Sequence, residues 1–262
     1  MAGISTNRNI RRILVALDTS VRSTAALEAA AELASEFQVQ LLGLFVEDIN
    51  LMHLAGLPFA REFGYFSATE RRLAFPDIER LFKVEAAHAQ RMLAQTAERM
   101  QLQWSFQVVR GQIFSEVFSI AGDADLIVFG KMAGTSTGKK TARTPSGLQQ
   151  VLILFDDIPA SQRALVAAAR LAQTTTAPLT VLIIGDTPGS LAHLEQIAVA
   201  QLAEIGLEAR ILHASKADAP HHAQAALTEK MGILVLARQN HALSRELQQL
   251  LGKISSPVVI VS

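Results

Sequence analysis

Hydrophobic residues form two kinds of pattern along the chain: short continuous runs, and longer stretches in which they return every three or four positions. Continuous runs are typical of parallel strands covered by helices on both faces, and the wider spacing is typical of amphipathic helices. Strands are predicted near 12–17, 39–46, 103–109, 125–129, 151–155, 179–184, 208–213, 232–237 and 257–261. Helices are predicted near 21–36, 78–100, 112–121, 160–173, 190–205, 221–230 and 242–251. The alternation predicts an α/β fold of doubly wound parallel sheets, with ligands beyond the carboxyl ends of the strands.

The two halves of this pattern repeat each other. Asp18 ends the first hydrophobic run and Asp156 ends its equivalent, with matching alanine-rich helices behind them, so the halves correspond at an offset of 138 in the numbering. Further along, from Asp125 to Gly232, the matching offset falls to 107. We therefore predict a duplicated α/β unit, in which half one has about 31 extra residues between its second and third strands.

Two segments depart from the repeat. An insertion of about 49–77 follows the second strand of half one, and a polar connector of about 131–149 joins the halves. We predict domain 1 over 1–147 and domain 2 over 148–262. The connector leaves little room for a fourth helix and fifth strand, so half one is expected to end early. Its exposed sheet edge would then need cover from the connector, half two or another chain.

The insertion is the most individual part of the chain. Its apolar stretch at 51–60 is followed by arginines, the single tyrosine and several phenylalanines. Aromatic residues with arginine are typical of interaction hot spots, and a lid packed on the protein's own sheet explains them equally well. Its place at the ligand end of the sheet suits either a gate over the cleft or a docking arm for a partner.

Composition narrows the functional classes. Lys+Arg and Asp+Glu each total 24, which gives nucleic acid or an anionic membrane no global attraction. The absence of cysteine excludes disulfides, thiolate catalysis and cysteine-ligated metals. No apolar run reaches the roughly 18–20 residues of a membrane helix, and no signal peptide is evident. We expect a cytoplasmic protein with no nucleic-acid partner and no membrane insertion.

The sequence offers little that indicates catalysis or a metal. His221 and His222 are adjacent and would point in different directions on a helix, so joint metal binding is not expected. The segment 134–141 resembles a phosphate-binding P-loop, but Ala133 and Lys140 occupy positions that need Gly and Ser or Thr. It is either a flexible polar connector or a degenerate anion site. We predict no catalytic residues and no metal site.

An aspartate directly after a strand has two explanations. Asp18 could cap the following helix or contact a ligand, and both possibilities stay open here. For Asp156, its equivalent in half two, the capping role is favoured.

In their order and spacing, these elements resemble the universal stress protein family as a tandem pair. The second strand ends Leu44-Phe45-Val46-Glu47-Asp48, the fourth reads Asp125-Leu126-Ile127-Val128-Phe129-Gly130, and the chain closes with Pro257-Val258-Val259-Ile260-Val261. The resemblance implies tandem Rossmann-like, adenine nucleotide α-hydrolase-like domains that pair through the fifth strand, and a family with nucleotide-binding and non-binding members.

In the binding members, as the resemblance implies, the Asp after strand one and a Val ending strand two contact adenosine. A loop of the form Gly-x2-Gly-x9-Gly-(Ser/Thr) then wraps the phosphates. Asp18, Val46 and Gly130 match, whereas the second glycine falls on Ala133, with Gly134 beside it. Half two reads Ala237-Arg238 where its loop should begin, so we expect half two to have lost nucleotide binding.

The resemblance therefore implies a regulatory or adaptor protein of the stress response, not an enzyme and without a cofactor. It would act by protein–protein interaction through the insertion, and would form a homodimer. The alternative is a switch in which half one binds ATP through Asp18, Val46, Gly130 and Gly134. A nucleotide hydrolase is a third hypothesis, disfavoured because Asp18-Thr19-Ser20 stands where related pyrophosphatases have Ser-Gly-Gly.

Overall fold

The structure is a computed structural model of the 262-residue chain. It describes residues 11–18, 21–57, 61–63, 70–72, 75–121, 126–130, 149–229, 232–238, 254 and 256–261. The predicted helix at 242–251, the predicted domain boundary at 147/148, most of the connector and Gly134 lie outside these residues.

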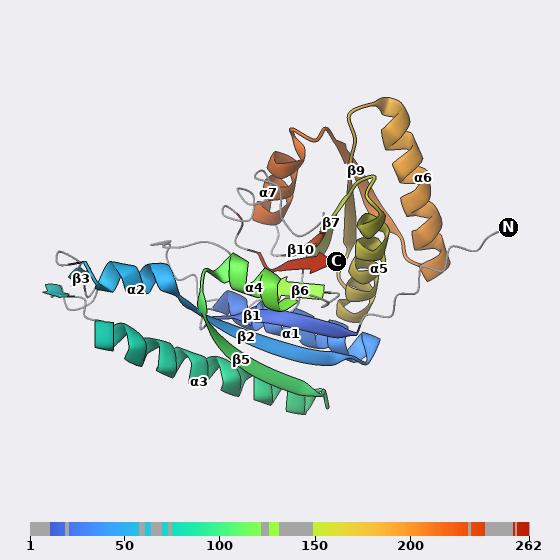
Figure 1. Cartoon of the computed structure of the whole chain (residues 1–262). Coiled ribbons are helices and arrows are strands. Elements are labelled where there is room, and N and C mark those ends of the chain that lie inside the picture. Colours follow the sequence, from blue (N-terminus) through green and yellow to red (C-terminus); the bar gives the residue numbers. More distant parts are fainter. Residues whose placement is uncertain are drawn as a thin grey trace.

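Nine strands form one sheet in the order β5-β2-β1-β6-β11-β10-β7-β8-β9 (Figure 1). Half one supplies β1 (Arg12–Leu17), β2 (Gln40–Asp48), β5 (Trp104–Gly111) and β6 (Leu126–Phe129). Half two supplies β7 (Gln150–Phe155), β8 (Leu179–Ile184), β9 (Ala209–Ala214), β10 (Gly232–Ala237) and β11 (Val258–Val261). The pairs within each half are parallel, and the halves meet through one antiparallel pair, β6 with β11. The predicted α/β doubly wound class is confirmed.

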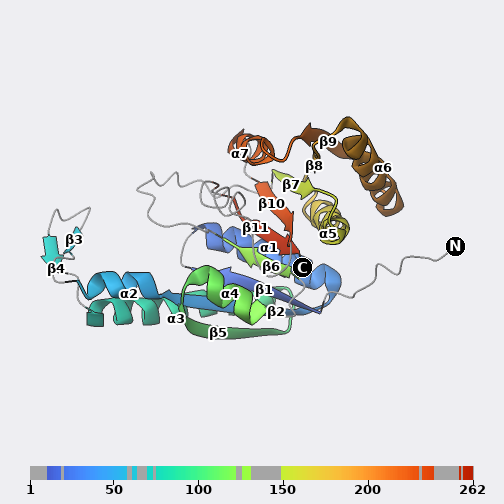
Figure 2. The ribbon, with the colours of Figure 1, turned by 45° about the horizontal axis from the view of Figure 1, so that its top comes forward.

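Helices cover both faces of the sheet (Figure 2). One face packs against α1 (Val21–Phe37), α3 (Phe75–Arg99), α5 (Pro159–Thr175) and α6 (Pro188–Ile205). The other packs against α4 (Ile113–Ala121) and α7 (Ala219–Glu229). The repeat-equivalent helices α1 and α5 contact each other as well as the sheet, and their alanine-rich faces are fully buried. Small side chains let these two helices approach the strands and each other closely.

The repeat holds at the level of strand register. Ile13 lies opposite Leu41 in half one, and Val151 lies opposite Leu179 in half two, so both strands keep the offset of 138. The ends of the first helices repeat too: Gln38 and Thr176, which are related by the same offset, adopt the left-handed conformation with φ of 52° and 53°. The duplication inferred from sequence therefore reaches the caps of the helices.

The position of the insertion follows from the other registers. The third-strand partners of Leu41 and Leu179 are Trp104 and Ala209, an offset of 105. The fourth strands keep the predicted offset of 107, as in Leu126 and Ile233 opposite Ile13 and Val151. Half one thus has 33 extra residues before its third strand (138 − 105) and two fewer between its third and fourth. The predicted excess of about 31 residues between the second and third strands is therefore two short, because the offset at the fourth strand, from which it was taken, also includes the two residues that half one lacks between its third and fourth strands.

Strand β11 is shared by the two halves. It pairs parallel with β10, and it also pairs antiparallel with β6, with Val259 opposite Val128. Half two therefore covers the edge that half one was expected to leave exposed. Because both edges of β11 are occupied, the fifth-strand pairing that the resemblance implies between protein chains is made within this one. A homodimer stays a prediction and would need another surface.

The insertion contains elements that the sequence pattern did not predict. A short helix, α2 (Ile49–Ala55), is followed by an antiparallel hairpin of β3 (Arg61–Phe63) and β4 (Glu70–Arg72). Helix α3 begins at Phe75 instead of near residue 78, with Pro76 and Asp77 in its first turn. Both residues favour a helix start, since proline lacks the amide that would be unpaired there and an acid complements the helix dipole.

Candidate functional site

Three of the four predicted ligand residues meet at one edge of the sheet. Leu17 lies opposite Phe45 on β2, and Ala16 lies opposite Phe129 on β6. The residues that follow in register, Asp18, Val46 and Gly130, therefore lie at or near the carboxyl ends of three adjacent strands. Chain order reverses between β1 and β6, and this is where ligands bind in open α/β sheets. The fourth predicted residue, Gly134, lies outside the described residues.

Local contacts hold this edge in place. The amide of Asp18 donates to Ser23 Oγ of α1 at 2.9 Å, and Ser23 is fully buried. Val46 is partly buried against the cluster on the α4 face, and Gly130 is buried. The turn after β1 is thus fixed by a buried serine from the first turns of the helix that follows it.

Asp156 occupies the equivalent turn of half two. Its amide contacts Ser161 Oγ, as the repeat requires, at 3.4 Å. Its Oδ1 accepts hydrogen bonds from the Ser161 hydroxyl and from the Ile158 amide. Ile158 is the N-cap of α5 and has no side-chain cap of its own. Asp156 therefore stabilises the turn into the helix, close to the capping role favoured from sequence, although it is not the N-cap.

Arg238 directly follows β10. Its equivalent in half one, at the offset of 107, is the residue after Gly130. Arg238 is only 8% exposed, its amide donates to the Val261 carbonyl at 2.7 Å, and its guanidinium carbon lies 5.3 Å from the centre of the Phe118 ring. Phe118 belongs to α4 of half one, so this is a cation–π contact between the halves. Nothing in the local sequence around Arg238 indicates this partner, which lies in the other half of the chain.

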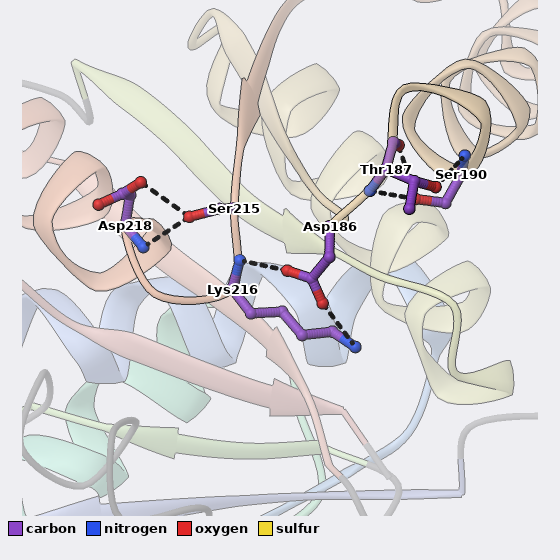
Figure 3. A network of polar contacts seen from close by, with 6 residues as sticks. All are labelled: Asp186, Thr187, Ser190, Ser215, Lys216 and Asp218. Carbon is purple, nitrogen blue, oxygen red and sulfur yellow. Dashed lines mark hydrogen bonds and ion pairs between the residues drawn. The ribbon is translucent and has the colours of Figure 1, made fainter.

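Polar side chains close the outer loops of half two (Figure 3). Asp186 accepts from the Lys216 amide at 3.3 Å and lies 3.5 Å from its Nζ, which joins the ends of β8 and β9. Thr187 and Ser190 form a reciprocal capping box at the start of α6. Ser215 donates to Asp218 at 2.7 Å. These groups satisfy one another within their own loops.

In half one the residue equivalent to Asp186 is Asp48, and the insertion begins directly after it. Asp48 is the N-cap of α2, and its Oδ1 accepts from the Asn50 amide at 2.9 Å. Helix α2 packs against α3 and β5, and Figures 1 and 2 both place the β3–β4 hairpin at the far end of α2, away from the nine-stranded sheet. We call the insertion, residues 49–77, the arm.

The arm and the adjoining turns of α3 have apolar side chains both in their buried contacts and on their exposed surface. Met52, Ala55, Ile78 and Phe82 are buried, and Phe82 makes an edge-to-face contact with Phe45 of β2 at 6.5 Å between ring centres. Five of the seven exposed large hydrophobic residues in the described part of the chain lie on this α2–α3 unit. They are Leu54, Leu57, Phe75, Leu81 and Val84, and they are 38% to 61% exposed.

Neither a metal cluster nor a membrane span emerges from the parts of the chain that are described. No group of three or more His, Asp or Glu side chains there could hold a metal ion. No helix among those residues is both long and apolar enough to cross a bilayer.

The fold is that of the universal stress proteins. A universal stress protein from Archaeoglobus fulgidus matches the structure with a TM-score of 0.56 and 14% identity, over 98% of each chain. A protein from Pseudomonas aeruginosa assigned to the same group matches with a TM-score of 0.50 and 15% identity, over 96% of this chain and 93% of that one. No protein-family model and no curated protein sequence matches the chain. Identities this low establish the fold, and the fold predicted from the resemblance is confirmed.

Proposed function

We propose that this chain is a regulatory protein without catalytic activity of its own, and that it acts by binding a partner protein through the arm and the adjoining turns of α3. The observation that carries the proposal is the concentration of exposed apolar side chains on the α2–α3 unit. A concentration of exposed apolar side chains on one unit favours an interaction site, because leaving them in water costs free energy that a partner recovers.

The repeat supports this assignment, since half two provides an internal reference. The two halves share their register and helix caps, and the arm is the largest addition to that common plan. Half two has a single exposed large hydrophobic residue in the described part of the chain, Val199 on α6, which is 50% exposed. The α2–α3 unit, which comprises the arm and the adjoining turns of α3, therefore carries most of the exposed large hydrophobic residues in the described part of the chain, and the partner should present an apolar surface to it.

Surface substitution tests the proposal. The double variant Leu54→Glu/Leu81→Glu places charges on the exposed apolar surface, and Val199→Glu is the matched control in half two. We expect a protein that co-purifies with the wild-type chain in stoichiometric amount to be lost from the double variant and retained by the control. Equal retention by both variants, with circular dichroism showing intact folds, would rule out the arm as the recognition element.

A second candidate function is ATP binding by half one. It is supported by the register that brings Asp18, Val46 and Gly130 to the ends of three adjacent strands where chain order reverses. Backbone amides at such an edge suit a phosphate where glycine leaves the approach open. Calorimetric titration with ATP, together with the nucleotide content of freshly purified protein, tests this function. Stoichiometry near one per chain supports it, and an empty protein that ignores ATP excludes it.

A further inference from the structure

Arg110 joins three elements at the base of the arm. It lies on β5 directly opposite Glu47 of β2, and its Nε and Nη2 both contact Glu47 Oε2 at 2.8 Å. The same Nη2 lies 3.7 Å from Glu79 Oε1, in the second turn of α3. One guanidinium therefore links the end of β2, the end of β5 and the beginning of α3.

The last three residues of β2 connect this link to two other features. Val46 belongs to the candidate ligand edge, Glu47 binds Arg110, and Asp48 caps the first helix of the arm. The Glu47 side chain is 15% exposed, against 47% for Arg110. Partial burial strengthens an ion pair relative to one in open solvent, so this pair restrains its elements more than a surface contact would.

The described part of half two links its second and third strands one residue further along, through Asp186 and Lys216, and does so without a residue from a helix equivalent to α3. The residue equivalent to Glu47, at the offset of 138, is Gly185, and the residue equivalent to Arg110, at the offset of 105, is Ser215. Gly185 instead donates its amide to the Ala214 carbonyl. The charged triad thus accompanies the arm and occurs in the half that carries it.

We propose that Arg110 is the positioning residue that fixes the direction of the arm relative to the carboxyl edge of half one. The tie of Arg110 to Glu47 and Glu79 locks the start of α3, and with it the packed α2, onto the two strands beside Val46. This inference rests on the proposed function only for the role of the arm in binding a partner. The contacts of Arg110 with Glu47 and Glu79 are present in the chain without any ligand.

The absence of cysteine in the chain makes the test direct. Leu54→Cys on α2 and Ser119→Cys on the exposed side of α4 accept spin labels, and pulsed electron paramagnetic resonance measures the distribution of distances between them. The background carries either Arg110 or Arg110→Met, which keeps the stem and removes the charge. The control is Arg99→Met, which removes a 2.6 Å pair with Glu28 at the other end of α3.

We expect a narrow distance distribution with Arg110 or with Arg99→Met. Arg110→Met should make it roughly twice as broad, because the arm then samples orientations that the tie excludes. Glu79→Gln, which removes only the α3 contact, should broaden it less, and this milder variant keeps the test valid if Arg110→Met unfolds. An unchanged width in both variants would overturn the proposal. The distance measurement uses neither ATP nor a partner protein. A negative result would therefore contradict the role of Arg110 without contradicting the proposed function.

Discussion

The two halves use the same aspartate at the end of the second strand for opposite purposes. Asp48 begins a helix that leads away from the sheet, whereas Asp186, its equivalent in half two, binds Lys216 and closes its loop onto the next strand. The strands before these residues share one register. Duplication thus preserved the buried pattern that specifies the sheet, and recognition features changed at the loops, where backbone and side chains are less constrained.

The ends of the first and fourth strands diverge in the same way. At these positions half one has Asp18 and the buried Gly130. In half two the Asp156 carboxylate binds Ser161, and Arg238 packs against the Phe118 ring. Half two also supplies β11, which completes the sheet of half one. Half two thus completes and braces the fold, while half one carries the candidate recognition features.

The largest expected effect comes from the shared strand. Ile260 of β11 is fully buried, so Ile260→Ala should lower the free energy of unfolding by about 2–5 kcal/mol. Because β11 pairs with both halves, unfolding in urea should remain a single transition. Trp104, the single tryptophan, reports half one by fluorescence, and circular dichroism reports the whole chain. Two separated transitions would show that the halves are independent; Val199→Ala serves as the surface control, within about 0.5 kcal/mol of wild type.

The next effect distinguishes the role of Asp18 in half one from that of Asp156 in half two. If half one binds ATP, Asp18→Ala should weaken affinity by roughly tenfold or more, the equivalent of a lost hydrogen bond to a charged group. Asp156→Ala should leave ATP affinity unchanged and lower the free energy of unfolding by about 1 kcal/mol, since its carboxylate stabilises the turn into α5. Calorimetric titration and urea unfolding measure the two effects. Equal losses of affinity would erase the distinction between the halves.

A third effect tests why the two halves pack differently against their second strands. Gly43 of β2 is equivalent to Val181 of β8, and a Cβ at Gly43 would lie 2.5 Å from Leu93 Cδ2 of α3. Importing the residue of half two, Gly43→Val, should destabilise the protein by about 1–3 kcal/mol through overpacking. In a Leu93→Ala background the same change should cost less, which a double-mutant cycle measures. Equal costs in the two backgrounds would mean that Leu93 does not set the requirement for glycine.

The smallest effect concerns Glu32 on α1, whose equivalent on α5 is Arg170. Burial raises the pKa of the Glu32 carboxyl, the neighbouring Glu28 raises it further, and Arg99 partly opposes them. A raised pKa means that the native state holds this proton more tightly than the unfolded state. The stabilisation is present below the ordinary pKa of glutamate and is lost as pH rises through the raised value.

Glu32→Gln should therefore be more stable than wild type at pH 7, by less than about 1 kcal/mol because the side chain is only partly buried. The difference should close as the pH falls and Glu32 becomes protonated. Urea unfolding across this pH range measures it, and a variant less stable than wild type at pH 7 would contradict the assignment.

Much of the fold could be predicted from the sequence because it depends on local patterns. Hydrophobic runs located the nine strands of the large sheet, and the constant offset between Asp18 and Asp156 revealed the duplication. The pairing of β11 with β6 could not be predicted, since antiparallel contact between strands from opposite halves of the chain leaves no periodic signal. From the sequence, half two was only one of three possible covers for the open sheet edge of half one, beside the connector and another chain.

The candidate site likewise contains residues that local sequence patterns predict and residues that they do not. Asp18, Val46 and Gly130 were found because each ends a recognisable strand. Helix α2 was missed although Asp48, a favourable N-cap, could have signalled its start. The triad of Arg110, Glu47 and Glu79 has no local signature, because its members are brought together only by parallel pairing and by helix packing.

Site-specific photo-crosslinking in cells would show whether the arm is the surface that a partner protein contacts. A photoreactive amino acid replaces Leu54 on the arm or Val199 on α6, two exposed apolar positions in opposite halves. The account predicts a discrete crosslink from position 54 to a different protein, and no corresponding product from position 199. Equal crosslinking from both positions, none from position 54, or a product containing only a second copy of this chain would contradict it.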